Sequence, residues 1–487
     1  MPRRLPSTGG APIPMNDRRT TPSHDDGENS IPSPGSSSSP ISGSAGGRWR
    51  RAAARLTRPE IEPAALRSYR HEQRTQLVLP IASALTEGGF IGVIADKVYH
   101  VHPGVLALIT AAPMFGLLSS FVWAQLALGR RKVPFTASLM LLFVGAVAAV
   151  AMLPEGPVGG WLLVTSMIAA RLMLGGIITI RSLVWTFNYP REARARVTSR
   201  LQFLTMSVMT LTSLAGGVFL DAHPESFRSV YAVGALLAAL GVLSFSRVRI
   251  IDEQAQLDRE RMEPKQPGTV VAPLLSAWSV LREDRPYANY QACQFLLGVS
   301  NMMIEAPLIY LVSHELQASY TTSIALTLAI PLGFSLLTLP LWAGYLDRVH
   351  ISEFRARHSW IWVVAQAITW YGAIHGSLLW IGVGRLLLGM GRGGGALAWQ
   401  LGHNDFARPE NVGLYMGVHV TLTGVRGAFA PFLGMLLYVG WASAELPGLG
   451  LRVPGFEGLG AHTIGLACLV GSLGAVGYWQ LHRRASR

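Results

Sequence analysis

The sequence predicts an all-α polytopic membrane protein whose twelve transmembrane helices form two pseudo-symmetric six-helix halves. Three observations lead to this prediction: the composition, the spacing of apolar runs, and a repeat of charged residues inside those runs. Of the 487 residues, 50% are hydrophobic and only 14% are charged. A soluble domain carries about 25% charged residues, so the composition favours a membrane protein.

The apolar runs have the length that a bilayer requires. About 20 apolar residues cross the ~30 Å hydrocarbon core as one helix, and backbone groups in lipid need partners within the same segment. The runs therefore predict helices. They cover 76–96, 104–128, 134–153, 161–187, 201–220, 229–247, 289–312, 321–345, 359–377, 379–401, 412–439 and 462–481.

Arginine and lysine in the loops predict the orientation, because cytoplasmic loops are enriched in both. With twelve spans, the alternate loops on one side carry only Lys97, Arg228 and Arg452. The other side carries most of the positive charge of the connecting loops. We therefore expect both termini in the cytoplasm and the protein in the plasma membrane, in bacteria the inner membrane. The net charge of +13 reflects this bias and a basic tail, and we do not expect nucleic-acid binding.

Composition also divides the chain. Residues 1–72 are rich in Ser, Pro, Gly and Arg and predict a disordered basic cytoplasmic tail. Residues 73–247 predict the first six-helix half, and 285–487 predict the second. The polar stretch 248–284 between them predicts a cytoplasmic linker, which ends in an amphipathic helix because apolar residues recur there at helical spacing.

The two halves repeat a pattern of charged residues. Arg171 and Arg385 lie 214 residues apart with similar neighbours, and Glu87 and Glu305 lie 218 apart. A charge in the middle of a spanning helix costs about 2.5 kcal/mol or more. Its recurrence in both halves therefore indicates duplication of a functional unit in parallel orientation.

Two six-helix halves with a central cytoplasmic linker resemble the major facilitator superfamily of secondary transporters. The stretch from Ala343 to His350 resembles the family's loop motif Gly-x-x-x-Asp-Arg-x-Gly, with Ala343 and His350 in place of its glycines. In the first half Gly129 and Arg130 keep the basic end of the motif, but Leu126 stands where Asp belongs. Arg171 and Arg385, each with a glycine four residues further along (Arg-x-x-x-Gly), resemble the family's fourth-span motif.

The resemblance implies a central cavity lined by spans 1, 4, 7 and 10, with the two halves rocking around it. It also implies conformational gating by Asp347, Arg348, Gly129 and Arg130. Asp347 should cap or pair near a neighbouring helix terminus in the outward-open state and be released when the cytoplasmic side opens. The stretch 427–434 partly resembles a Gly/Pro motif of antiporters, but it lies in the eleventh span and not in the fifth.

Glu87 and Glu305 are the candidates for proton coupling. Desolvation favours the protonated form of a carboxyl, whereas a nearby arginine favours the ionised form. A glutamate that gains or loses an arginine as the halves move would therefore take up or release a proton. Two alternatives stay open: static ion pairs between neighbouring spans, and direct contact with the substrate.

Five arginines and two glutamates lie well inside the predicted spans, so an anionic substrate could supply the missing negative charge. Arg171 and Arg385 either bind charge or brace the halves by pairing with the glutamates. The unmatched Arg181 and Arg392 are candidates for selecting the solute, and Asn301 is a polar candidate in the cavity. The intramembrane charged residues are Glu87, Arg171, Arg181, Glu305, Arg385, Arg392 and Arg426.

The sequence predicts secondary active transport of a small solute, proton-coupled, with an anionic substrate or drug-like efflux as the candidate cargo. We expect a monomer with no cofactor and no metal site. A transporter-like sensor or scaffold that signals through the long amino tail is the alternative. A membrane-embedded enzyme is the third reading, and the absence of a His-Glu-x-x-His motif argues against it.

Overall fold

The computed structural model describes residues 63–262, 278–408, 411–446 and 451–485. The predicted tail 1–72 therefore lies largely outside the described residues, as does most of the amphipathic helix expected after residue 273. Residues 278–283 of that segment are helical. One correction concerns the start of the first helix, which begins at Pro63, inside the predicted tail.

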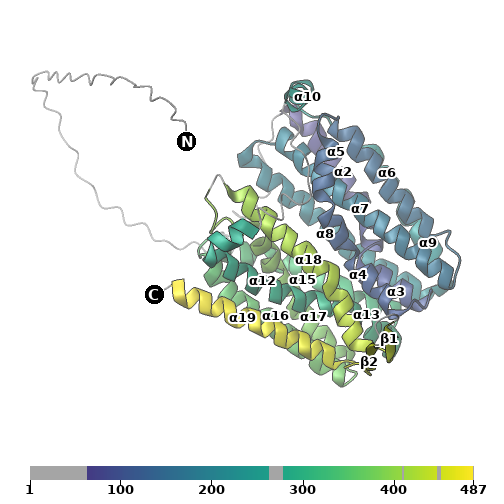
Figure 1. Cartoon of the computed structure of the whole chain (residues 1–487). Helices are drawn as coiled ribbons and strands as arrows, with labels where there is room; N and C mark the ends of the chain where they lie inside the picture. The colour runs from purple at the N-terminus through teal and green to yellow at the C-terminus, as the bar shows by residue number, and fades with distance from the viewer. Residues whose placement is uncertain (1–62, 263–277, 409–410, 447–450, 486–487) are drawn as a thin grey trace, which may run out of the picture. The chain divides into compact units, whose positions relative to one another are not determined.

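The first half is a set of long helices that pack side by side (Figure 1). Its elements are α2 (Pro63–Leu85), α3 (Gly88–Lys97), α4 (Pro103–Leu118), α5 (Ser120–Ala127), α6 (Lys132–Val150), α7 (Pro157–Asn188), α8 (Arg191–Ala222), the 3-10 turn η1 (Pro224–Ser226) and α9 (Phe227–Phe245). A short polar helix, α10 (Glu253–Met262), follows in the linker.

The second half repeats this order with more interruptions. Its elements are α12 (Arg285–Met303), α13 (Glu305–Tyr310), the π-helix η2 (Leu311–Glu315), α14 (Tyr320–Ile324), the π-helix η3 (Ala325–Ala329), α15 (Ile330–Leu346), α16 (Ile351–Ile374), α17 (Leu378–Leu401), α18 (Val412–Val439), β1 (Ala444–Leu446), β2 (Leu451–Val453) and α19 (His462–Ala485). The strands β1 and β2 pair antiparallel, and this ribbon is an exception to the predicted all-helical fold.

Each of the twelve predicted runs coincides with one helix or with consecutive helices, so the predicted fold class is confirmed. Within the described residues, nine such segments are long and apolar enough to cross a membrane, and the bent pair α2–α3 makes ten. The helices α16 and α17 have 24 residues each and are less apolar because they carry buried polar and charged side chains.

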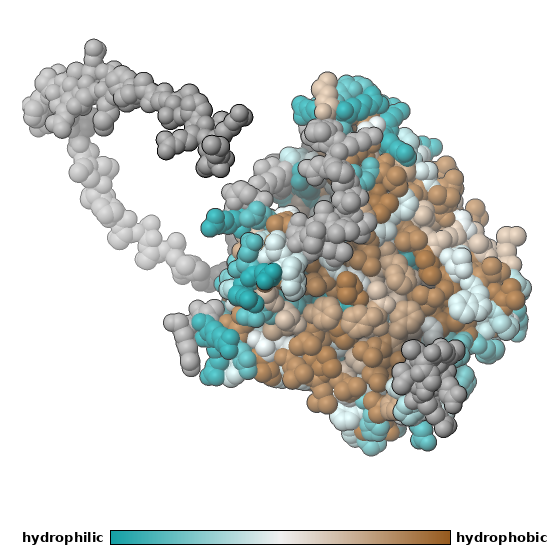
Figure 2. Space-filling model, in the orientation of Figure 1, coloured by the Kyte–Doolittle hydropathy of each residue, from teal (hydrophilic) through white to brown (hydrophobic). Residues whose placement is uncertain are grey.

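The outer surface of the helices is apolar. Leu141, Leu236 and Leu337 are each more than half exposed. Figure 2 shows hydrophobic residues across the broad middle of one face, with hydrophilic residues gathered towards its margins and around α10. Large exposed apolar patches are rare on soluble monomers, so this surface fits contact with lipid.

Two names describe the ends of the helical bundle. The end with α10 is called the linker end, and the end with β1 and β2 is called the ribbon end (Figure 1). Both halves lie in one compact unit, Leu56–Arg487. One large core cluster includes Phe90 of α3, Ile309 of α13 and Leu326 of η3, so apolar packing joins the two halves.

Candidate functional site

A cavity of about 460 Å³ lies between the two halves. The first half contributes residues of α4, α5 and α7, and the second half contributes residues of α12, α16, α17 and α18. The polar residues at its wall include Arg171, Asn301, Arg355, Arg392, Thr423 and Arg426. Along α7 and α12 the wall extends from Arg171 and Asn301 towards the linker end, so the cavity occupies the middle and the linker-end part of the bundle.

Glu87 lies where the first span breaks. The helices α2 and α3 meet there at an angle of 40°, and a helix end leaves carbonyl groups without intrahelical partners. Arg171 of α7 fills this gap: its Nη1 lies 3.0 Å from Oε1 of Glu87, and its Nη2 donates to the carbonyl oxygen of Thr86. The first matched arginine therefore pairs with the first matched glutamate.

The second matched pair has a looser geometry. Arg385 is fully buried, and its Nη2 lies 3.9 Å from Oε2 of Glu305, which begins α13 directly after the break at Ile304. The same guanidinium donates to the carbonyl oxygens of Leu326 at 2.9 Å and Thr327 at 3.3 Å. Both carbonyls belong to the π-helix η3, a distortion that is frequent at functional sites.

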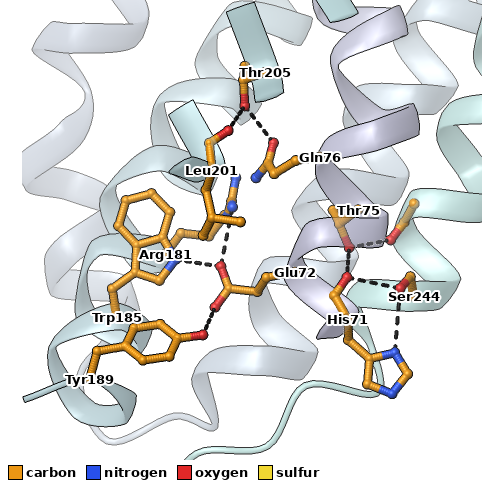
Figure 3. A network of polar contacts seen from close by, with 11 residues as sticks. His71, Glu72, Thr75, Gln76, Arg181, Trp185, Tyr189, Leu201, Thr205 and Ser244 are labelled. Carbon is orange, nitrogen blue, oxygen red and sulfur yellow. Dashed lines mark hydrogen bonds and ion pairs between the residues drawn. The ribbon is translucent and has the colours of Figure 1, made fainter. Parts of the chain in front are cut away.

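Arg181 pairs with an acid from the predicted tail. Its Nη2 lies 3.3 Å from Oε2 of the fully buried Glu72. The same carboxylate accepts hydrogen bonds from Trp185 Nε1 at 2.5 Å and from the Tyr189 hydroxyl at 3.1 Å. Figure 3 shows α7 side chains converging on Glu72 of α2. Arg181 does not line the cavity described above, in contrast to its predicted role as a substrate residue.

The surroundings of Glu72 complete this polar cluster. When its amide oxygen faces the guanidinium, Gln76 accepts from Arg181 and donates to Thr205 of α8. Burial, followed by the Glu72 carboxylate, raises the pKa of Tyr189, so its hydroxyl remains protonated and donates to Glu72. The cluster satisfies a buried charge and joins α2, α7 and α8 near the linker end.

Arg355 is a cavity residue that the hydropathy pattern does not reveal. It falls in a predicted cytoplasmic loop because the apolar run begins only at 359. The helix α16 starts earlier, at Ile351, and Arg355 is buried with 2% exposure. Its guanidinium lies 5.9 Å from the ring centre of Tyr478. Arg355 stands only four positions before the apolar run, and this closeness is the sequence signal that could have placed it on the same helix.

Three further polar residues that the sequence singled out, Arg426, Arg392 and Asn301, line the cavity. Arg426 is buried, and its Nη1 donates to the carbonyl oxygen of Gln294 at 2.6 Å. Arg392 is exposed at the wall. Asn301 has a buried amide oxygen without a hydrogen-bond partner. The structure thus brings Arg171, Arg392 and Asn301 to one cavity, whereas Arg385 is not one of its lining residues.

The first-half loop motif is held by the linker. Gly129 has a φ of +66°, which favours glycine, and its N–H donates to Oε2 of Glu260 at 2.7 Å. Nζ of Lys132 lies 2.5 Å from the same oxygen. Glu260 of α10 thus supplies a carboxylate to a loop whose motif lacks its own acid at Leu126. Arg130 is exposed.

The second-half loop motif lies at the linker end of α15. Asp347 and Arg348 are exposed and line a pocket with Leu401, the last residue of α17, and with residues that follow it. At the start of α16, Oδ2 of Asp405 accepts from the Ile351 N–H at 2.8 Å, and Nδ1 of His350, the N-cap residue, accepts from the Ser352 N–H at 3.1 Å. The contact that the resemblance implies for Asp347 in the outward-open state stays a prediction.

Hydrogen bonds between the halves gather at the ribbon end. Asp96 of α3 accepts from the Ser313 hydroxyl at 2.7 Å and lies 3.3 Å from Nδ1 of His314. Asp221 of α8 accepts from the N–H groups of Tyr320 and Thr321 at 2.6 and 3.1 Å. These contacts close the ribbon end, on the side away from the cavity.

Comparisons with known proteins agree with this architecture. The model of the Major Facilitator Superfamily matches residues 77–431. A search of curated proteins found no match. Among solved structures, a mutant form of the nucleoside transporter NupG superposes with a TM-score of 0.65 at 11% identity, over 86% of this chain and 99% of that one.

Two further structures are similar. The POT family transporter PepTSo has a TM-score of 0.62 at 11% identity, over 86% of this chain and 98% of that one. The xylose transporter XylE from E. coli, in a partially occluded inward open conformation, has a TM-score of 0.59 at 11% identity, over 86% and 98%. At such identities the likeness concerns the fold, whereas the family match covers most of the chain. The chain therefore belongs to the Major Facilitator Superfamily.

Proposed function

We propose that this protein is a secondary active transporter that moves a small solute by alternating access and couples this movement to protons. The family and the cavity between the two halves support transport. The closed ribbon end supports a state in which the cavity is reached from the linker end. By the positive-inside rule, we propose that the linker end is cytoplasmic, which makes this state inward-facing.

The observation that carries the coupling proposal is the pair Arg171–Glu87. It joins a wall residue of the cavity to a carboxyl at a helix break, with N and O 3.0 Å apart. The Glu87 side chain keeps 28% exposure, so a proton can reach it. Protonation removes the charge that holds the pair together. Loading a proton would therefore loosen α7 from the first span and free the guanidinium for a substrate.

Glu305 is the second candidate for coupling, and its environment differs in one respect. Arg385 keeps two hydrogen bonds to η3 carbonyls even when Glu305 becomes neutral. Neutralising one partner of a buried ion pair costs less free energy when the remaining charged group still has hydrogen-bond partners in the protein. We propose that Glu305 exchanges protons with less disturbance than Glu87, while Arg385 mainly braces η3 and α17.

Alternating access also requires that the ribbon-end contacts open. Asp96 and Asp221 hold the second half through a hydroxyl, an imidazole and two backbone N–H groups. We propose that these contacts form the closed gate of the inward-facing state. Asp347 and Arg348 at the opposite end would form contacts when that gate opens. A symmetric exchange of contacts between the two ends describes the rocking motion.

The test is transport in proteoliposomes that contain the full-length protein. A pH gradient is imposed, and proton flux is recorded with a panel of organic anions, cations and neutral solutes. We expect solute-dependent proton flux in the wild type and its loss in the Glu87→Gln, Glu305→Gln double variant. Solute uptake that ignores the gradient would contradict coupling. Equal proton flux in the wild type and the double variant would show that these two residues do not couple.

A further inference from the structure

The arginines of the helical core fall into two groups. Arg171, Arg181 and Arg385 each face a carboxylate, namely Glu87, Glu72 and Glu305. No ion pair is recorded in the described part of the chain for three others: Arg355, Arg392 and Arg426. All three line the same cavity, from three different helices, α16, α17 and α18.

The wall of that cavity offers these arginines no acid. Apart from Arg171, which pairs with Glu87, its other residues are apolar, amide, hydroxyl or aromatic, without Asp or Glu among the described residues. Arg355 rests against Tyr478, and Arg426 donates to a backbone carbonyl. Like charges in a low-dielectric cavity repel each other, and an isolated buried charge is strongly disfavoured. A complementary anion would relieve both penalties.

Unused donors point to the same chemistry. The Nε and Nη2 atoms of Arg355 and the Nε atom of Arg426 are buried without hydrogen-bond partners. Both residues are more than nine-tenths buried. Buried polar groups in native proteins are almost always satisfied, and exceptions call for an explanation such as a bound group. The fork of a guanidinium fits carboxylate or phosphate oxygens.

The position of Arg426 depends on a glycine of α12, the helix that its guanidinium contacts. A Cβ atom added at Gly298 of α12 would lie 2.3 Å from Nε and Cζ of Arg426. Glycine therefore allows the guanidinium to lie directly against α12 beside Gln294 and the cavity. The site also has an apolar side, which includes Met114, Leu117 and Leu297.

We infer that this cavity binds a small organic anion that carries at least two negative charges. Its anionic groups would lie among Arg355, Arg392 and Arg426, and its apolar part would lie against Met114, Leu117 and Leu297. The minimum of two charges follows because a monoanion would leave two of the three arginines without a partner. This inference rests on the proposed function, since it names the class of solute for the transport cavity.

The binding test uses purified full-length protein and matched ligands in isothermal titration calorimetry. Phenyl phosphate is compared with phenyl methyl phosphate, and succinate with monomethyl succinate, at a pH where the first member of each pair is a dianion. We expect at least one dianion to bind about tenfold or more tightly than its monoanion, the effect of one charged hydrogen bond. Equal affinity within both pairs, or no binding of either dianion, would overturn the inference.

Variants connect the binding to the three arginines. Arg392→Gln should weaken dianion binding by about tenfold or more, and Arg392→Lys should restore part of it. Gly298→Ala should also weaken binding, because it displaces the Arg426 guanidinium without changing any charge. Arg484→Gln removes an exposed arginine outside the cavity and should leave the affinity unchanged. Wild-type affinity in Arg392→Gln and Gly298→Ala would contradict the assignment of the site.

The outcomes separate this inference from the proposed function. Proton-driven uptake of a neutral or cationic solute, without dianion binding, would overturn the inference and leave the transport proposal standing. Dianion binding that depends on Arg392, without flux of any solute in proteoliposomes, would support the site and contradict the transport proposal.

Discussion

The Nη1 atom of Arg171 lies 3.0 Å from Oε1 of Glu87, and its Nη2 atom reaches the carbonyl oxygen of Thr86. One side chain of α7 therefore satisfies both the charge and the backbone at the break between α2 and α3. We therefore expect protonation of Glu87 to weaken one of these contacts and to leave the other, because only the contact with the carboxylate needs a negative charge.

Glu87→Gln should abolish proton coupling while it leaves the fold intact. The neutral amide still accepts a hydrogen bond from Arg171, so we expect a loss of about 1–3 kcal/mol in the free energy of unfolding. Proton flux in proteoliposomes and thermal unfolding in detergent measure the two effects. Glu225→Gln, at an exposed position of the ribbon end, serves as the control. Unchanged coupling in Glu87→Gln would remove this residue from the mechanism.

Glu72→Gln should destabilise the protein more than Glu87→Gln does. Glu72 is fully buried and has three donors, and its loss leaves Arg181 buried without a counter-charge. Breaking such a pair costs about 3–5 kcal/mol. The double variant Glu72→Gln, Arg181→Met should recover part of this loss, because it removes the uncompensated charge. Thermal unfolding of the wild type, the single variant and the double variant measures this. A double variant less stable than Glu72→Gln would contradict the paired role.

Asp96→Asn should weaken the closed gate at the ribbon end. The amide keeps one acceptor for Ser313 but loses its charge beside His314. Spin labels at Met152 and His375, exposed at this end of the first and second halves, report the separation of the halves in a Cys293→Ala, Cys468→Ala background. We expect a larger population at long distance in Asp96→Asn. An unchanged distance distribution would show that Asp96 does not hold the gate.

Asp347→Asn should shift the protein towards the state described here. Asp347 is exposed in this state, so its replacement removes no contact recorded here, whereas the opposite state would lose the contact expected from the family motif. Accessibility of an introduced cavity cysteine, Leu174→Cys, to a maleimide added from the linker end should therefore increase. Equal labelling with and without Asp347→Asn would contradict the gating role.

Much of the fold could be predicted from hydropathy, because a bilayer requires apolar runs of fixed length. The matched pairs of charges could also be located, although only the structure shows that Arg171 and Arg385 contact the two glutamates at 3.0 and 3.9 Å. The ribbon between α18 and α19 and the π-helices could not be predicted, since both depend on local backbone geometry and tertiary packing.

Charged residues in helical segments outside the apolar runs were the main source of error. Glu72 and Arg355 lie outside the apolar runs, so hydropathy assigns them to a tail and a loop. Both lie on helices that extend beyond the hydrophobic run, and both are buried by neighbouring helices. The balance of charges changes as a result: Arg181 gains a partner, and the cavity gains a third unpaired arginine.

The carboxylate of Glu260 contacts Gly129 and Lys132, so the first-half loop has a carboxylate partner although its own motif position lacks an acid. The carboxylate comes from the linker, about 130 residues further along the chain than the loop it serves. A position-by-position comparison with the motif would find leucine at position 126 in place of aspartate, although the carboxylate of Glu260 contacts the same loop. Because Glu260 belongs to α10, a movement of α10 would also act on the loop of Gly129 and Lys132 in the first half. A carboxylate can thus occupy the same place in the fold while it comes from a different segment of the sequence, here the linker helix α10.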